Sequence, residues 1–332
     1  MRATFIAADN PSHGDVNTSF YRILIPAKYL RKTGHEISTQ LCPVAERPQG
    51  RADLINYSSL AEVVLVERII SPEMVRMLRL AGVKRIILTF DDNYRLLPED
   101  SQSKKNWDHF GLLNDFLSAL PLVDLVIVPS AKLKSDFIGL NGNIKVVPNY
   151  LDVDLYQGLR RTEDKTLGWG GTVQHKISWQ KSGIVRDLKN VLKRQPDWKL
   201  LIFGPAPVEI LREAEVPFEF VEQVYFDDWP KAVARFTIGL APLFGEYDRR
   251  RSNLKVVEYG ALHIPFVATD YEPYKDGSTG GFLVGTGSWS SSLEELMESE
   301  TLRNELGDFG WEWAQQFMMP AGTQRYEDLL WG

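Results

Sequence analysis

The sequence predicts an α/β protein with two doubly wound parallel-sheet domains in tandem. Apolar runs rich in Val, Ile and Leu alternate with helical patterns along the whole chain, which is typical of parallel sheets covered by helices on both faces. The 332 residues are enough for about two domains of roughly 150 residues each. The polar stretch 157–165 (QGLRRTEDK) separates two similar series of runs. We therefore expect a first domain over residues 1–150, a second over 151–310 and a helical tail over 311–332.

In the first series, six apolar runs predict strands at residues 3–8, 36–41, 62–66, 84–90, 123–128 and 144–147. Helical patterns lie between them at residues 17–32, 72–81, 108–119 and 131–138. Ser71 followed by Pro72 indicates a helix start, because Ser caps unpaired N–H groups and Pro suits the first helical position. Ser130 predicts a second capped helix in the same way.

The second series predicts strands at residues 166–169, 199–203, 218–224, 237–241, 265–268 and 281–284, with helices between them. From Leu302 to Phe317, apolar residues recur at helical spacing, and more of them gather before the C-terminus. We therefore expect a C-terminal helix over 302–332 that packs back toward the first domain.

The amino-acid composition argues against several classes of function and site for this chain: binding of a polyanion through overall charge, disulfide-stabilised folds and zinc sites. With 38 Lys and Arg against 44 Asp and Glu, the net charge is −6, so the protein as a whole does not attract a polyanion. The single cysteine, Cys42, cannot form an internal disulfide, and no Cys/His cluster has zinc-site spacing. We expect a cytoplasmic protein without a metal or cofactor. No apolar run reaches the ~18 residues of a spanning helix. Peripheral membrane contact and the oligomeric state stay open.

Loops that follow strands matter most, because open parallel sheets bind ligands at the carboxyl ends of their strands. After the strand that ends near Trp169, glycines are followed by a hydroxyl and mobile cations, which together suit a phosphate. The candidates are Gly170, Gly171, Thr172, His175 and Lys181, before a helix expected to begin around Ser182. The alternative is an ordinary tight turn between strand and helix.

A second candidate loop follows the strand near residues 237–241. A helix N-terminus with nearby cations suits a diphosphate, and Glu258, one turn into the helix, could accept both hydroxyls of a ribose. The candidates are Arg251, Ser252, Asn253, Leu254, Lys255 and Glu258. The alternative is an i,i+3 ion pair between Lys255 and Glu258 on a solvated helix.

In the first domain, Asp91 and Asp92 end an apolar strand and should point into the cleft. One of these carboxylates could orient a substrate hydroxyl or act as a general base. The alternative is that they cap the next helix or begin a loop. His13 and Gly14, in the loop after the first strand, are expected to contact the bound substrate rather than form an ordinary turn.

Several of these segments resemble one family. Residues 252–261 (SNLKVVEYGA) and 264–269 (IPFVAT) resemble the donor-binding segment of GT-B-fold glycosyltransferases of the family 4 type. Residues 147–152 (VPNYLD) look like the domain hinge of that family. Residues 167–175 and 201–205 (LIFGP), which include Gly204, resemble the first loop and the next strand of its second domain.

The resemblance implies a retaining, metal-independent hexosyl- or pentosyltransferase in which a nucleotide-diphosphate sugar, first of all a UDP-sugar, lies between two Rossmann-like domains. It implies that Glu258 binds the ribose, that Lys255 and Lys181 or His175 neutralise the pyrophosphate, and that the backbone near Val224 and Tyr225 holds the base. The acceptor would be a hydroxyl of a saccharide or glycan, with a modified nucleic-acid base as the alternative. An Asp91 or Asp92 base would instead permit inversion.

One position departs from the family. Retaining members usually carry a second Glu eight residues before the ribose-binding one, and here that position is Arg250. Contacts to the sugar hydroxyls must therefore differ. Because of this departure, two alternative functions remain: a non-catalytic nucleotide-sugar-binding protein, and a nucleotide-sugar epimerase with the same fold.

Basic residues in the first domain raise the question of a nucleic-acid partner. With Trp107 they could form a track for a polyanion, although scattered charges of this kind usually only solvate a surface. They are Arg76, Arg79, Lys84, Arg85, Arg95, Lys104 and Lys105.

Overall fold

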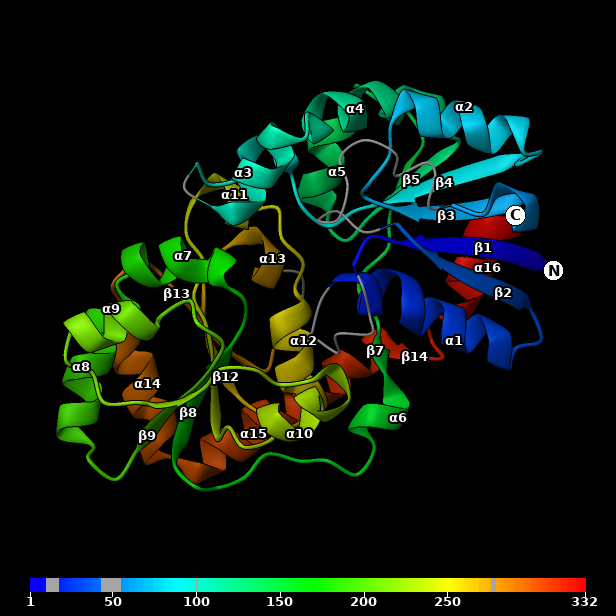
Figure 1. Cartoon of the computed structure of the whole chain (residues 1–332). Helices are drawn as coiled ribbons and strands as arrows, with labels where there is room; N and C mark the ends of the chain where they lie inside the picture. The colour runs from blue at the N-terminus through cyan, green and yellow to red at the C-terminus, as the bar shows by residue number, and fades with distance from the viewer. Residues whose placement is uncertain (10–17, 43–54, 100, 276–278) are drawn as a thin grey trace.

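The computed structural model describes residues 1–9, 18–42, 55–99, 101–275 and 279–332. Two six-stranded parallel sheets, each covered by helices, lie one in each half of the chain (Figure 1). The predicted fold class, with two doubly wound α/β units, is confirmed. His13 and Gly14 lie outside the described residues.

The first sheet has the order β2-β1-β3-β4-β5-β6. Its strands are β1 Arg2–Ala7, β2 Glu36–Leu41, β3 Val63–Glu67, β4 Arg85–Thr89, β5 Leu125–Val128 and β6 Ile144–Val146. Every residue of β5, and all but the first of β3 and β4, is buried, as expected for central parallel strands. All six strands were predicted from their apolar runs.

The helices of the first half partly differ from the prediction. They are η2 Phe20–Leu24, a π-helical turn, then α1 Ile25–Lys32, α2 Pro72–Leu80, α3 Gln102–His109, α4 Leu112–Ala119 and α5 Ala131–Phe137. Helix α3 was not predicted, because its sequence (QSKKNWDH) is too polar to show an apolar stripe. Ser71 and Ser130 cap α2 and α5 as expected, with side chains that accept from Met74 N and Leu133 N.

The second sheet has the order β10-β9-β8-β11-β12-β13. Its strands are β8 Thr166–Gly170, β9 Lys199–Phe203, β10 Glu219–Val221, β11 Ile238–Ala241, β12 Phe266–Thr269 and β13 Gly281–Val284, all predicted. The main helices are α7 Lys176–Lys181, α8 Ile184–Arg194, α9 Val208–Glu213, α10 Trp229–Val233, α11 Gly245–Asp248, α12 Leu254–Ala261, α13 Glu272–Lys275, α14 Trp289–Glu298 and α15 Glu300–Ala314. The helix expected to begin around Ser182 is α8, which begins at Ile184, and the short helix α7 that precedes it was not predicted.

Helix α12 packs closely on α15. A Cβ added to Gly260 would lie 2.5 Å from the carbonyl oxygen of Gly310, so only glycine lets the two backbones approach this closely. This contact fixes α12, which carries Lys255 and Glu258, beneath the cleft.

The prediction of one continuous C-terminal helix over residues 302–332 is wrong. After α15 the chain forms β14 Met318–Met319 and then α16 Thr323–Trp331, and Pro320 between them lacks the N–H that a continuous helix needs. Strand β14 pairs in parallel with β7 Leu151–Asp152 at the link between the sheets.

Helix α16 does pack back on the first domain, as predicted (Figure 1). Arg325 Nη2 donates to Val146 O at 2.5 Å, and His35 Nε2 lies 2.9 Å from Glu327 Oε1. Among the described residues, no helix combines the length and the apolar character needed to cross a membrane.

Candidate active site

A cavity of about 550 Å³ lies between the carboxyl ends of the two sheets. Loops after β1, β3 and β4 form one wall, and loops after β8, β9 and β11 form the other. The site therefore lies where open parallel sheets bind ligands.

Most of the predicted site residues that the structure describes line this cavity. They are Asp91, Asp92, Gly170, Gly171, Thr172, His175, Gly204, Val224, Arg251, Ser252, Leu254, Lys255 and Glu258. Three others do not. Lys181 is exposed at the end of α7 with its Nζ 5.9 Å from the Phe244 ring centre, Tyr225 is 56% exposed, and Asn253 is the N-cap of α12.

Two glycine loops bring the backbone close together on the second-domain wall. Gly204 has a φ of 90°, and a Cβ there would lie 2.1 Å from Gly171 O. Gly171 N donates to Phe203 O at 3.0 Å, so this N–H is already used within the protein. The turn is therefore tight, and the donors available to an anion here are mainly side chains.

Three nitrogen-bearing side chains meet beside this turn. Lys255 Nζ donates to Gly170 O, and burial lowers the pKa of Lys255 to about 8. Arg251 Nη1 lies 2.6 Å from His175 Nε2. Because a guanidinium can only donate, Nε2 of His175 must accept, and the ring proton lies on Nδ1.

His175 is thus a neutral hydrogen-bond donor beside Arg251 and Lys255, which are both partly buried. Burial, and then the charges of Arg251 and Lys255, hold the pKa of His175 well below its usual value. Its Nδ1 is buried and has no hydrogen-bond partner among the described residues. With Arg251, this group can receive an anion such as a phosphate.

Glu258 lies deeper on the same wall. Its Oε1 accepts from the Tyr21 hydroxyl at 2.7 Å and from Trp229 Nε1 at 2.9 Å, and burial raises its pKa. Glu258 is 4% exposed, and among the described ion pairs none joins it to Lys255 within 4.0 Å. The alternative of a solvated i,i+3 ion pair is therefore wrong. Tyr21 belongs to η2, so its hydrogen bond also joins the two domains.

Asp91 and Asp92 face these groups from the first-domain wall. Asp91 Oδ2 accepts from Thr18 Oγ1 at 2.7 Å, while Oδ1 is buried without a hydrogen-bond partner in the described part of the chain. Asp92 Oδ1 lies 3.9 Å from Arg251 Nε, and burial, followed by the charge of Asp91, raises the pKa of Asp92 to about 6. They do not cap the next helical turn, because Asn93 does so by accepting from Arg95 N at 3.1 Å.

The cavity thus places the group of Arg251, Lys255 and His175 on one wall opposite Asp91 and Asp92 on the other. Residues 165–299, which supply most of the donor-rich wall, match the family described as glycosyl transferases group 1. Over these residues the chain resembles a group 1 glycosyltransferase. The family match confirms the predicted resemblance and the prediction of a sugar-transferring enzyme. No curated protein sequence matches the chain.

Solved structures with similar folds are GT-B glycosyltransferases and related enzymes. Sucrose-phosphate synthase from Thermosynechococcus elongatus superposes with a TM-score of 0.74 at 12% identity, over 99% of this chain and 98% of that one. HepE from Anabaena, solved with UDP and glucose, gives 0.70 at 13% identity over 99% of both chains. A glycosyltransferase from Rickettsia africae gives 0.68 at 12% identity, over 99% of this chain and 97% of that one. At these identities the likeness shows the fold.

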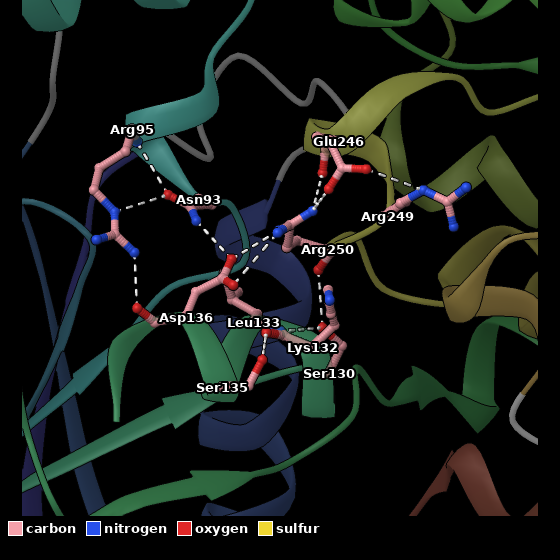
Figure 2. Close-up of polar contacts among 10 residues, drawn as sticks. All are labelled: Asn93, Arg95, Ser130, Lys132, Leu133, Ser135, Asp136, Glu246, Arg249 and Arg250. Atoms are coloured by element: carbon pink, nitrogen blue, oxygen red, sulfur yellow. Dashed lines mark hydrogen bonds and ion pairs between the residues drawn. The ribbon is translucent and has the colours of Figure 1, made fainter. Parts of the chain in front are cut away.

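Arg250 is not among the residues that line the cavity, and its side chain points to Asp136 instead (Figure 2). Its Nε donates to Oδ2 of Asp136 in α5 at 2.7 Å, and its own carbonyl oxygen accepts from Ser130 Oγ at 2.9 Å. The position at which the family usually has a carboxylate is therefore used here for contact between the two domains.

The sequence did not single out Glu67 and Arg68, which follow the same rule for strand ends. Arg68, directly after β3, lines the cavity and forms an ion pair with Asp9. Glu67 ends β3 and accepts from Ala8 N at 2.9 Å, and burial raises its pKa to about 7. Their place at a strand end was the signal, as it was for Asp91.

The basic residues of the first domain, which were considered as a track for a polyanion, do not surround an exposed aromatic ring. Trp107 is 5% exposed and stacks on Tyr94 at 3.8 Å between ring centres, so it is not a free stacking platform. Several of the cations have acidic partners, in the pairs Arg76–Glu73, Arg79–Asp124, Lys84–Glu62 and Lys104–Asp108.

Proposed function

We propose that the protein transfers a hexosyl or pentosyl group from a UDP-sugar to a hydroxyl group of a saccharide or glycan, with retention. The observation that carries the proposal is the group of Arg251, Lys255 and His175 opposite Asp91 and Asp92 in one cavity. The cavity volume, about 550 Å³, is within the usual range for small-molecule sites. HepE, which has a similar fold, was solved with UDP and glucose and also with UDP-glucose.

The donor would lie along the second-domain wall. Its diphosphate would be bound by Arg251, Lys255 and the Nδ1–H of His175, and its ribose by Glu258. Tyr21 and Trp229 hold the Glu258 carboxylate in place by donating to Oε1, and the Tyr156 hydroxyl also hydrogen-bonds this carboxylate. A ribose hydroxyl would bind to the same carboxylate from the cavity side. The loop at Val224 would hold the base.

Catalysis would depend on charge at the leaving group. As the bond from the sugar C1 to the diphosphate oxygen breaks, negative charge grows on the diphosphate, and fixed positive groups stabilise it more than they stabilise the bound donor. The acceptor oxygen then bonds to C1. With retention, its proton passes to the departing diphosphate oxygen on the same face. Asp91 or Asp92 would orient the acceptor hydroxyl.

We propose that side chains provide all of this positive charge and that no divalent metal is required. Among the described residues, no three His, Cys, Asp or Glu side chains form a group that could hold a metal ion. Turnover should therefore persist in excess chelator. Complete loss of turnover that magnesium or manganese restores would contradict the proposal and indicate Asp91 and Asp92 as ligands.

Product analysis tests the function. The protein is incubated with a panel of UDP-sugars, with and without saccharide acceptors, and free UDP and the anomeric form of the product are measured. We expect acceptor-dependent UDP release and a retained anomer. An isomerised donor without acceptor would indicate an epimerase. Donor binding without UDP release across saccharides and nucleic acids would indicate a non-catalytic binding protein, and glycosylation of a nucleic-acid base would correct the acceptor class.

A further inference from the structure

The segment from residue 245 to residue 252, which we call the bridging segment, joins β11 to α12 and reaches the first domain. Tyr247, in α11, is buried in the first domain's hydrophobic core together with Tyr94 and Trp107. At the other end of the segment, Asn149 Nδ2 donates to Ser252 Oγ at 3.2 Å. The bridging segment is therefore held from both ends by residues outside its own sheet.

Two consecutive residues of this segment contact different partners. Arg250 faces Asp136 of α5 in the first domain (Figure 2), and neither Arg250 nor Asp136 is among the residues that line the cavity. Arg251 lines the cavity and reaches His175, with Asp92 3.9 Å from its Nε. Because the two residues are adjacent, the contacts that fix the backbone at Arg250 also affect the orientation of Arg251.

The pair formed by Arg250 and Asp136 is well shielded. Their side chains are only 12% and 15% exposed, and Asn93 Nδ2 also donates to Asp136 Oδ2 at 2.7 Å. Although burial opposes it, these hydrogen bonds hold the pKa of Asp136 below its usual value, so the carboxylate is charged at neutral pH. Ser130, which caps α5, fixes the Arg250 carbonyl as well.

We infer that Arg250 is a positioning residue for the donor site: its ion pair with Asp136 holds the bridging segment against the first domain, so that Arg251 faces the diphosphate. The inference rests on the proposed function for the identity of the ligand. It makes donor affinity depend on a residue of the opposite domain that never contacts the donor. A merely structural pair would change thermal stability and leave donor affinity unchanged.

The test compares two variants that each remove one carboxylate partner of Arg250. Asp136→Ala removes the partner in the first domain, and Glu246→Gln removes the partner within α11, which is 67% exposed. UDP affinity is measured by calorimetry and backbone hydrogen exchange is measured over the bridging segment. We expect Asp136→Ala to weaken UDP binding about tenfold and to speed exchange in the segment, and Glu246→Gln to stay within about twofold of wild type.

A charge swap provides the rescue. Asp136→Arg combined with Arg250→Asp should recover part of the affinity that either single change loses. If Asp136→Ala does not fold, Arg250→Gln is measured in its place with the same expectation.

Two results overturn the inference. One is wild-type UDP affinity in Asp136→Ala, and the other is unchanged hydrogen exchange over the bridging segment. Failure of the proposed function looks different, because wild type itself would then bind no nucleotide diphosphate. Hydrogen exchange would still show whether the ion pair holds the segment.

Discussion

Lys255 and Glu258 lie one helical turn apart, yet their surroundings give them different roles. Lys255 lines the cavity beside the Gly170 carbonyl, where we propose that it binds the diphosphate, whereas Glu258 is held by Tyr21 and Trp229. We expect Lys255→Ala to raise the donor KM and to lower kcat, because its attraction grows as the diphosphate leaves. The loss should be on the order of 1.5–3 kcal/mol, or about ten- to a hundredfold in kcat/KM.

Glu258→Gln should raise the donor KM with little change in kcat, because the amide oxygen can still accept from Tyr21 and Trp229 while the negative charge is lost. Glu258→Ala should also destabilise the fold by about 1–3 kcal/mol, since two buried donors lose their acceptor. Steady-state kinetics and thermal unfolding of both variants check this. Unchanged donor KM in Glu258→Gln would remove the residue from the ribose site.

The pH dependence of kcat/KM follows from Asp92 and Lys255. With its pKa near 6, Asp92 is ionised above that pH, and Lys255, with its pKa near 8, is charged below that pH. Activity should therefore rise with pH through about 6, as the carboxylate forms, and fall through about 8, as the ammonium is lost. Asp92→Asn should abolish the acid limb. If kcat/KM does not change between about pH 5 and about pH 9, which is one pH unit beyond each pKa, these roles are contradicted.

At the scale of elements, the twelve strands of the two sheets could be predicted, because buried parallel strands are continuous Val, Ile and Leu runs. The rule that ligands bind at strand ends also brought Asp91, Gly170 and Lys255 to one cavity. The packing of the C-terminal helix on the first domain was predicted, but the side-chain pairs that join the domains at the cavity and beside it could not be. Tyr21–Glu258 and Asp136–Arg250 join residues 237 and 114 positions apart, and no local spacing indicates such pairs.

The packing of α12 on α15 gives a prediction about element placement. Gly260→Ala should destabilise the fold by about 1–3 kcal/mol, because its Cβ would meet the Gly310 backbone, and it should weaken donor binding by displacing α12. Gly139→Ala is the matched control, since nothing lies within 4 Å of its added Cβ, and it should stay within about 0.5 kcal/mol. Equal thermal stabilities would show that α12 and α15 tolerate separation.

For the whole molecule, three kinds of contact hold the two sheets around one cavity. Strand β14 pairs with β7 at the link, Tyr21 donates a hydrogen bond to Glu258 in the cavity lining, and Arg250 pairs with Asp136 outside the cavity lining. In the proposed function, a donor bound to the second domain would lie opposite the carboxylates of the first. Shielding the donor from water in this way would favour transfer over hydrolysis.

The most direct test of this account is calorimetry of the wild-type protein with the diphosphates of uridine, guanosine, adenosine and thymidine, repeated on Lys255→Ala. We predict that UDP binds with a Kd below millimolar and that Lys255→Ala weakens this binding at least about tenfold, because Lys255 lines the cavity and is proposed to bind the diphosphate. If none of the four binds below millimolar concentration, or if Lys255→Ala binds UDP as wild type does, the cavity is not a nucleotide-sugar site of the kind described.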